Sequence, residues 1–130
     1  MTDPEICAAV RQHYGLAVRA VERIDRGSAA LFKLYGSEAA FILKVFQPKF
    51  RADSILREVH VTDFLRQNGI SVPEYISCRN GDFYFMQNGR IAILQAFIPG
   101  QTREKGCCSK RELLDSARLL AQIVNALDHY

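Results

Sequence analysis

The sequence predicts an α+β fold in which helices pack on a mostly antiparallel sheet of five to six strands. Short apolar runs alternate with turns that contain glycine, which is typical of antiparallel hairpins. One helical pattern follows the third run, and other helical patterns stand at the two ends of the chain. Strands and helices are thus grouped rather than regularly alternating, as expected for the α+β class.

The chain begins with a predicted helix. Thr2 and Glu5 have the spacing of a capping box, and Pro4 suits a first-turn position. Apolar residues follow at helical spacing from Ile6, and Gly15 fits the exit of the helix.

Three strands are predicted next, because apolar residues recur in short runs that turn residues separate. The runs are Leu16 to Ile24, Ala30 to Tyr35, and Ala39 to Phe46. The turns lie at residues 26–28 and 36–38, and both contain glycine. These strands are expected to form consecutive antiparallel hairpins.

A second helix and a meander are predicted in the middle of the chain. Asp53 or Ser54 could cap the helix, and Gly69 suits its exit. The pairs Asn80-Gly81 and Asn88-Gly89 then separate three apolar runs, which is a strong hairpin signal. These runs are Tyr75 to Cys78, Phe83 to Gln87 and Ile91 to Phe97.

The last helix is predicted from the capping-box spacing of Ser109 and Glu112. Five apolar residues form one stripe along it, which makes the helix amphipathic. They are Leu113, Ala117, Leu120, Val124 and Leu127.

Composition excludes several classes of function. The net charge of +3 is small and evenly spread, so we expect no nucleic-acid partner. No apolar run approaches the about 20 residues of a membrane span, and the first 20 residues have no signal-peptide pattern. The four cysteines match no zinc-site spacing. We therefore expect a cytoplasmic protein with reduced thiols and no membrane partner.

Lys44 is the anomaly in the third strand, since it interrupts the apolar segment "FILKVF". It shares a strand face with Ile42 and Phe46, and an ammonium on an apolar face needs a partner. The partner could be a protein carboxylate, a ligand phosphate or both. Alternatively, Lys44 lies near an edge and extends its amine into water.

Glu58 is the candidate carboxylate, because it shares a helix face with apolar residues such as Ile55 and Leu65. An ion pair between Lys44 and Glu58 would resolve both anomalies together. Burial of such a pair is weak evidence for stability and better evidence that a charge is positioned for use.

The chain resembles the N-terminal lobe of the aminoglycoside phosphotransferase, choline kinase and homoserine kinase group, which has the kinase-like fold. The stretches that carry the resemblance are "IDRGSAALFKL", "FILKVF", "REVHVTDFLRQNGISVPEYI" and "AILQAFIPGQ". It covers residues 16 to 128. Members of that group transfer the γ-phosphoryl of ATP to small-molecule hydroxyls, so the resemblance implies ATP with Mg as the cofactor.

The resemblance implies roles for four residues at the phosphate end of a nucleotide site. Gly27 and Ser28 would lie over the phosphates, Lys44 would contact the α- and β-phosphates, and Glu58 would hold Lys44. Ala29 and Ala30 stand where many relatives have a polar residue, so phosphate contacts from this turn would come from backbone N–H groups.

The resemblance also implies an adenine site at the end of the last strand. Backbone groups of Gln95 and Phe97 would bond the adenine edge, and Leu94 would line the pocket behind it. Residues 1–98 would form the nucleotide-binding lobe, and residues 99–130 would form a loop near the hinge and the first helix of a second lobe.

The sequence departs from the family in one large respect. The catalytic loop, a His-x-Asp followed by an Asn, does not occur, nor does the later Asp that holds magnesium. We therefore expect a fragment that is not catalytic by itself, whose full-length protein would act on a small-molecule hydroxyl. The metal ligands would lie in the missing lobe.

The stripe on the last helix predicts a partner, because exposed apolar patches of this size mark interaction surfaces. We expect a homo-oligomer formed through residues 109–128. The alternative function is a non-catalytic α+β interaction module, in which the pair Lys44–Glu58 is only structural and the last helix mediates oligomerisation.

Overall fold

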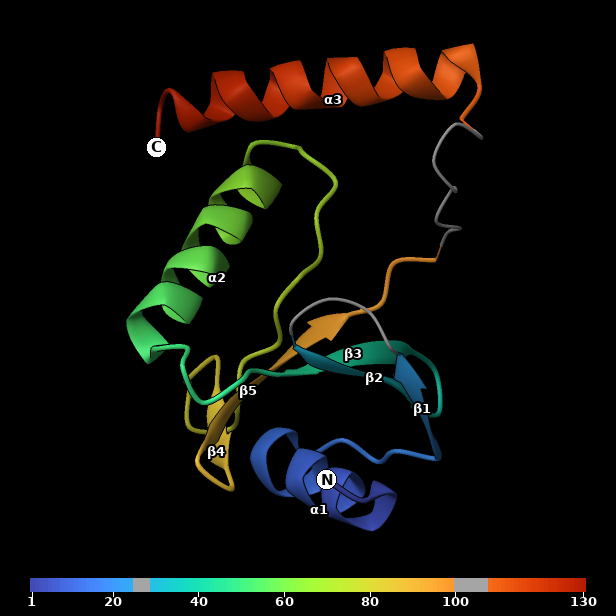
Figure 1. Cartoon of the computed structure of the whole chain (residues 1–130), viewed down its shortest axis with the longest axis vertical. Helices are drawn as coiled ribbons and strands as arrows, with labels where there is room; N and C mark the ends of the chain where they lie inside the picture. Colours follow the sequence, from blue (N-terminus) through green and yellow to red (C-terminus); the bar gives the residue numbers. More distant parts are fainter. Residues whose placement is uncertain (25–28, 100–107) are drawn as a thin grey trace.

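The computed structural model describes residues 1–24, 29–99 and 108–130 of the chain. These residues form a five-stranded sheet and three helices (Figure 1), which confirms the predicted α+β class. The elements are α1 (Asp3–Tyr14), β1 (Ala20–Ile24), β2 (Ala30–Tyr35), β3 (Ala40–Val45), α2 (Ala52–Gln67), β4 (Phe85–Gln87), β5 (Arg90–Ala96) and α3 (Lys110–Leu127). The predicted phosphate turn at Gly27 and Ser28 lies outside the described residues.

Strand β3 lies at the centre of the sheet. The strand order is β1-β2-β3-β5-β4, and every neighbouring pair is antiparallel. In this register Lys44 stands opposite Leu31 of β2 and Ile93 of β5. Directly opposite residues point to the same side of a sheet, so these three side chains share one face.

Helix α1 covers the other face, whose buried residues are apolar. Its capping box is formed as predicted, since the Thr2 hydroxyl accepts a hydrogen bond from the Glu5 N–H, and Gly15 ends the helix in a left-handed conformation at φ 72°. The buried residues of α1 pack on buried residues of the sheet and on Cys78. The cluster contains Ile6, Ala9, Val10, Tyr14, Phe32, Leu34, Leu43, Val45, Cys78, Phe85, Ala92 and Leu94.

Helix α2 packs on the face that carries Lys44, so the sheet lies between α1 and α2 (Figure 1). Ile55 forms a second core cluster with Phe46, Ile91 and Ile93. The predicted caps Asp53 and Ser54 are wrong, because the helix begins earlier. Its N-cap is Arg51, which makes no side-chain capping bond.

Of the predicted meander, only the hairpin at Asn88-Gly89 is confirmed. Asn88 and Gly89 adopt φ values of 52° and 75°, as a type I′ turn between β4 and β5 requires. The run from Tyr75 to Cys78 is not a strand, since only the isolated bridge between Tyr75 and Gln95 joins it to the sheet. Pro73 just before it has no N–H to extend the pairing. The first strand also begins at Ala20 rather than at Leu16.

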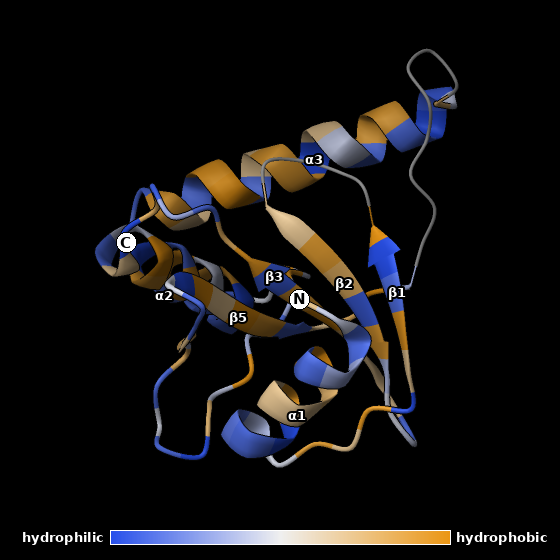
Figure 2. Ribbon diagram, turned by 60° about the horizontal axis from the view of Figure 1, so that its bottom comes forward, coloured by the Kyte–Doolittle hydropathy of each residue, from blue (hydrophilic) through white to orange (hydrophobic). Residues whose placement is uncertain are grey.

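Helix α3 has the predicted N-cap, since the Ser109 hydroxyl accepts a hydrogen bond from the Glu112 N–H at 3.1 Å. None of its residues is buried, and apolar side chains are exposed along its length (Figure 2). Its C-terminal end approaches α2, where the rings of Phe64 and Tyr130 meet edge to face at 5.1 Å. Across residues 1–24, 29–99 and 108–130, none of the helices could cross a lipid bilayer.

The hydroxyl of Tyr14 is a polar atom buried in the apolar core. It has no hydrogen-bond partner among the described residues. Burial is the main cause that raises the pKa of Tyr14, and the nearby Cys78 thiol adds to the effect. The phenol therefore stays neutral in the folded protein at pH values where the unfolded chain ionises it.

We predict that Tyr14→Phe leaves stability at neutral pH unchanged or raises it by about 1 kcal/mol, because the unpaired hydroxyl is removed. Above a pH of about 10 the unfolded chain releases the Tyr14 proton and the native state does not, so this residue makes stability fall as pH rises. Tyr14→Phe should therefore flatten that fall by at most about 1.4 kcal/mol per pH unit. Urea denaturation between pH 7 and 11 measures both effects.

The control for this experiment is Tyr130→Phe, since Tyr130 is 62% exposed and should keep the wild-type slope. A loss of more than about 2 kcal/mol in Tyr14→Phe at pH 7 would show that the hydroxyl does have a bonding partner.

Candidate functional site

Lys44 and Glu58 meet as the sequence predicts. The Lys44 Nζ lies 3.3 Å from the Glu58 Oε1, and the two residues come from the central strand and from the helix that covers its face. A cation and a carboxylate from consecutive elements are thus joined over the sheet.

The pair is less buried than the apolar surroundings in the sequence suggested. The side chains of Lys44 and Glu58 are 25% and 42% exposed. The physical reason is that α2 packs on the sheet through apolar residues such as Ile55 and Val59, whereas the Glu58 carboxylate meets the polar groups of Lys44 and Tyr75 instead of the apolar cluster. The expectation of a pair inside the core is wrong, and both groups remain within reach of a ligand.

Tyr75 is a third member of the site that the sequence analysis did not identify. Its hydroxyl donates a hydrogen bond to the Glu58 Oε1 at 2.9 Å, which is the oxygen that Lys44 also approaches. Partial burial raises the pKa of Tyr75, and the negative charge of Glu58 raises it further. The phenol is therefore a neutral donor at physiological pH.

The Lys44 face continues from β3 to the end of β5. Ile42 stands opposite Gln95 in the pairing, so Gln95 shares this face. Lys33 of β2 extends along the same face, with its Nζ 3.8 Å from the ring centroid of Phe97. The face thus carries a cation at its centre and an aromatic ring at the end of the last strand.

The backbone at the end of β5 alternates between two directions. The Phe97 N–H bonds the Ala40 carbonyl at 3.1 Å, and Gln95 pairs with β3 in the same direction. The Ala96 N–H points the other way and bonds the Glu74 carbonyl at 2.8 Å. Alternation therefore turns the Ala96 carbonyl and the Ile98 N–H away from β3, and no hydrogen bond of the described residues uses either group.

The predicted backbone contacts of Gln95 and Phe97 with the adenine edge are not possible in this hydrogen-bonding pattern. The Phe97 N–H is already bonded, and the backbone of Gln95 belongs to the sheet, so neither is available to a ligand edge. Leu94 has no exposed surface and lies in the α1 core, on the face opposite Lys44. The side chain of Leu94 therefore lines no pocket on the Lys44 face.

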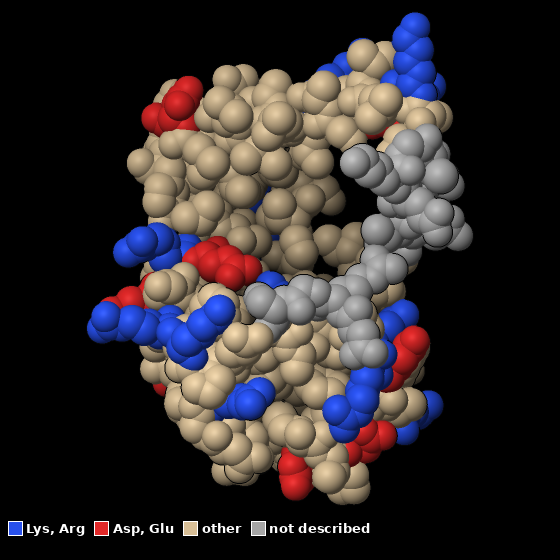
Figure 3. All heavy atoms as spheres, viewed as in Figure 1, with Lys and Arg blue, Asp and Glu red and all other residues tan. Residues whose placement is uncertain are grey.

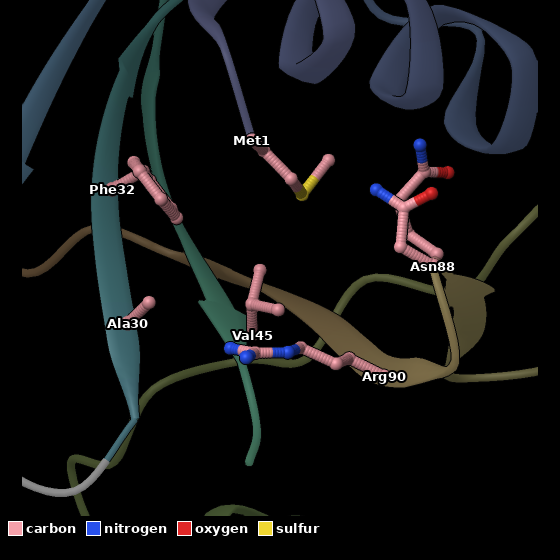
Figure 4. A pocket seen from close by; sticks show the side chains of 7 residues that line it. Met1, Ala30, Phe32, Val45, Asn88 and Arg90 are labelled. Atoms are coloured by element: carbon pink, nitrogen blue, oxygen red, sulfur yellow. The ribbon is translucent and has the colours of Figure 1, made fainter. Parts of the chain in front are cut away.

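Two hollows have the same volume, one on the α1 face and one between the ends of α2 and α3, bordered by Asn68 and Gln122 among others. The hollow on the α1 face lies on the wrong side of the sheet for a nucleotide at Lys44. It measures about 380 Å³ and is bordered by Met1, Phe32, Val45 and Arg90, among others (Figure 4). Phe32 and Val45 belong to the α1 core, so this hollow is separated from Lys44 by the sheet. On the other side, Figure 3 shows an open gap between α3 and the body of the molecule.

The site offers no set of ligands for a metal ion among the described residues. No group of three or more His, Cys, Asp or Glu side chains that could hold a metal ion occurs in the described part of the chain. Glu58 is the carboxylate of the pair, and Lys44 and Tyr75 already occupy its Oε1. We therefore assign no metal ligand to these residues.

A family model described as "Phosphotransferase enzyme family" matches residues 6–130. The chain belongs to this family. The suspected resemblance to the aminoglycoside phosphotransferase group is thereby confirmed over nearly the whole chain. A search of curated proteins finds no significant match.

Solved structures of phosphotransferases share the fold of this family member. A spectinomycin phosphotransferase in complex with ADP and spectinomycin superposes with a TM-score of 0.75 and 13% identity, covering 94% of this chain and 37% of that one. A microcompartment-associated aminopropanol kinase superposes with a TM-score of 0.68 and 18% identity, and the match covers 98% of this chain and 40% of that one. An amicoumacin kinase bound to AMP-PNP and Ca²⁺ superposes with a TM-score of 0.68 and 15% identity, and the match covers 81% of this chain and 34% of that one. This chain thus spans about two fifths or less of the length of these three structures.

These likenesses confirm the predicted fold class, which is that of a kinase-like N-terminal lobe. The shared elements are the antiparallel sheet, the helix after the third strand and the helices at both ends.

We predict that Lys44→Met changes the free energy of unfolding by less than about 1 kcal/mol, because a half-exposed ion pair contributes little to stability. Urea denaturation at pH 7 measures the change. A loss of about 3 kcal/mol or more would indicate a buried structural pair and would favour the interaction-module interpretation.

Proposed function

We propose that this chain is the ATP-binding lobe of a small-molecule phosphotransferase. The observation that carries the proposal is the Lys44–Glu58 pair, which stays partly exposed between the central strand and α2 in a member of a phosphotransferase family. An ion pair that is this exposed contributes little to stability, so stability alone does not explain a charged residue on the central strand. A cation that must reach a ligand has to stay accessible.

The triphosphate would lie against the Lys44 face. Lys44 would bond phosphate oxygens, since an ammonium with one carboxylate partner retains further N–H donors. Gly27 and Ser28 would cover the phosphates through backbone N–H groups. Glu58 would hold Lys44 in position.

The adenine would lie at the end of β5. Its edge needs one acceptor and one donor, and the Ala96 carbonyl and the Ile98 N–H offer that pair facing away from β3. Gln95 and Phe97 would then contribute side chains from the Lys44 face rather than backbone groups. This assignment follows from the alternation of hydrogen bonds along the strand.

The remaining parts of the reaction would come from a second lobe. Mg²⁺ would be supplied with ATP, and its protein ligands would lie beyond residues 1–98, together with the contacts to the acceptor. The acceptor would be a small molecule with a hydroxyl group. Two solved relatives are a spectinomycin phosphotransferase and an aminopropanol kinase, which supports this class of substrate.

We predict that the chain binds Mg-ATP and that Lys44→Ala weakens binding by about ten- to a hundredfold, because a charge-assisted hydrogen bond is lost. Titration followed by NMR measures both dissociation constants. The matched control is Lys49→Ala, since Lys49 is exposed in the loop after β3 and should keep wild-type affinity.

Two results would contradict the proposal. Equal affinity of Lys44→Ala and the wild type would remove Lys44 from the phosphate site. A wild-type chain that shows no binding at millimolar Mg-ATP would show that residues 1–130 do not form a nucleotide site by themselves.

The exposed stripe of α3 favours a second candidate function, which is self-association. Its residues Leu113, Leu120, Val124 and Leu127 are 40% to 61% exposed, and none of the described residues covers them. Two copies of the chain could bury these stripes against each other. The interaction module would need only this surface, whereas the ATP-binding lobe also needs the Lys44 face.

We predict that the chain is a dimer or larger assembly and that Leu120→Glu makes it monomeric, because a carboxylate cannot be buried in an apolar interface without a partner. Light scattering coupled to gel filtration measures the mass. Gln122→Glu adds the same charge on the opposite side of the helix and should leave the assembly intact. A monomeric wild type, or an unchanged mass in Leu120→Glu, would contradict self-association through α3.

A further inference from the structure

We propose that Lys33 is a specificity-determining residue of the nucleotide site, which binds the nucleoside half of the ligand while Lys44 binds the phosphates. The inference rests on the ATP-binding function proposed above and adds a residue to that same site. The direction of the Lys33 side chain and its contact with Phe97 carry the inference.

The Lys33 side chain is not paired with the carboxylate nearest to it in the sheet. Glu22 of β1 stands directly opposite Lys33, where opposite charges on one face can pair. The Glu22 carboxylate instead accepts a hydrogen bond from the Tyr35 hydroxyl at 2.8 Å. No carboxylate of residues 1–24, 29–99 and 108–130 forms an ion pair with Lys33. Charge pairing within these residues therefore does not explain where this ammonium lies.

Two aromatic rings hold the Lys33 ammonium. Its Nζ lies 3.8 Å from the ring centroid of Phe97 and 4.9 Å from that of Tyr35. Strand β3 separates β2 from β5 in the sheet (Figure 1), so the side chains of Lys33 and Phe97 meet over β3. They meet near Ala40, which stands opposite Tyr35 and accepts a hydrogen bond from the Phe97 N–H. A ring face attracts a cation, so these contacts keep the half-buried side chain in one place.

The position of the ammonium coincides with the end of the sheet proposed for the adenine. Phe97 lies between the Ala96 carbonyl and the Ile98 N–H, the two groups proposed to bond the adenine edge. Lys33 stands opposite Ile42, which places it diagonally from Lys44 on the same face. The contact with Phe97 draws its ammonium toward Ala40, which is away from Lys44 along β3.

The two lysines therefore suit different halves of one nucleotide. The triphosphate carries the negative charge, and Lys44 with its carboxylate partner Glu58 lies at that end. The nucleoside half is neutral and offers hydrogen-bond acceptors, which are ring nitrogens of the base and oxygens of the ribose. The Lys33 ammonium has three N–H donors and can bond such acceptors while it stays over the Phe97 ring. Lys33 thus favours a nucleotide over an inorganic polyphosphate of the same charge.

The test compares three ligands by NMR titration of the whole chain. Adenosine has no phosphate, inorganic tripolyphosphate with Mg²⁺ has no nucleoside, and Mg-ATP has both. Lys33→Met keeps an apolar stem and removes the charge and the donors. We expect it to bind adenosine and Mg-ATP about three- to tenfold more weakly and to bind tripolyphosphate as the wild type does. Lys44→Ala should show the reverse pattern, with unchanged adenosine binding and weaker binding of both phosphate ligands.

The matched control is Lys49→Met. The Lys49 Nζ also lies over an aromatic ring, that of Phe50 at 5.5 Å, but in the loop after β3. This variant should bind all three ligands as the wild type does. Urea denaturation of each variant separates loss of folding from loss of a ligand contact.

A second readout uses only the wild-type chain. Protons held over a ring face resonate upfield, so the ε-methylene signal of Lys33 should lie upfield of the signals of exposed lysines. Adenosine should shift this signal, and tripolyphosphate should leave it in place. An ε-methylene signal at the position of an exposed lysine would overturn the contact with Phe97, and so would a signal that adenosine does not move overturn the ligand contact.

The outcomes separate this inference from the function on which it rests. Equal losses of Mg-ATP and tripolyphosphate affinity in Lys33→Met would assign Lys33 to the phosphates and overturn the inference. Unchanged affinity of Lys33→Met for adenosine and Mg-ATP would overturn it as well. In both cases Mg-ATP binding by the wild type would still support the proposed function. A wild type that binds none of the three ligands would overturn the proposed function and this inference together.

Discussion

One charged position on the central strand governs the arrangement of this lobe. Lys44 lies in β3 with a paired strand on each side, so its ammonium has to leave the sheet on the α2 face. The only stable arrangements supply a carboxylate there or an opening to water. The structure supplies both, with the Glu58 carboxylate 3.3 Å from the Lys44 ammonium and a quarter of the Lys44 side chain exposed.

The two faces of the sheet consequently differ in role. The α1 face is a continuous apolar core that contains Leu43 and Leu94 without exposed surface. The α2 face holds a smaller apolar cluster beside the polar group of Lys44, Glu58 and Tyr75. Stability is thus concentrated on one side, and the other side retains the accessible charge on which a function can depend.

Local signals in the sequence predicted several parts of the fold that short-range chemistry decides, although the expected caps of α2, Asp53 and Ser54, did not form. The Thr2 capping box and the Asn88-Gly89 turn need only residues close in sequence, and both formed. The face of Leu94 and the partner of Tyr75 depend on the pairing register of strands far apart in the chain, which one sequence does not specify. The degree of burial of Glu58 likewise depends on how α2 sits over the sheet, so its pairing was predictable and its exposure was not.

Helix α3 constrains both candidate functions in the same way, because its apolar stripe needs a cover in each of them. The helix touches α2 near its C-terminal end, through Phe64 and Tyr130, and leaves the stripe open. A second lobe or a second copy would satisfy the hydrophobic requirement equally well, so the stripe alone cannot distinguish them. The distinction lies on the Lys44 face, where an interaction module has no use for an exposed cation held by two elements, and a nucleotide-binding lobe requires one.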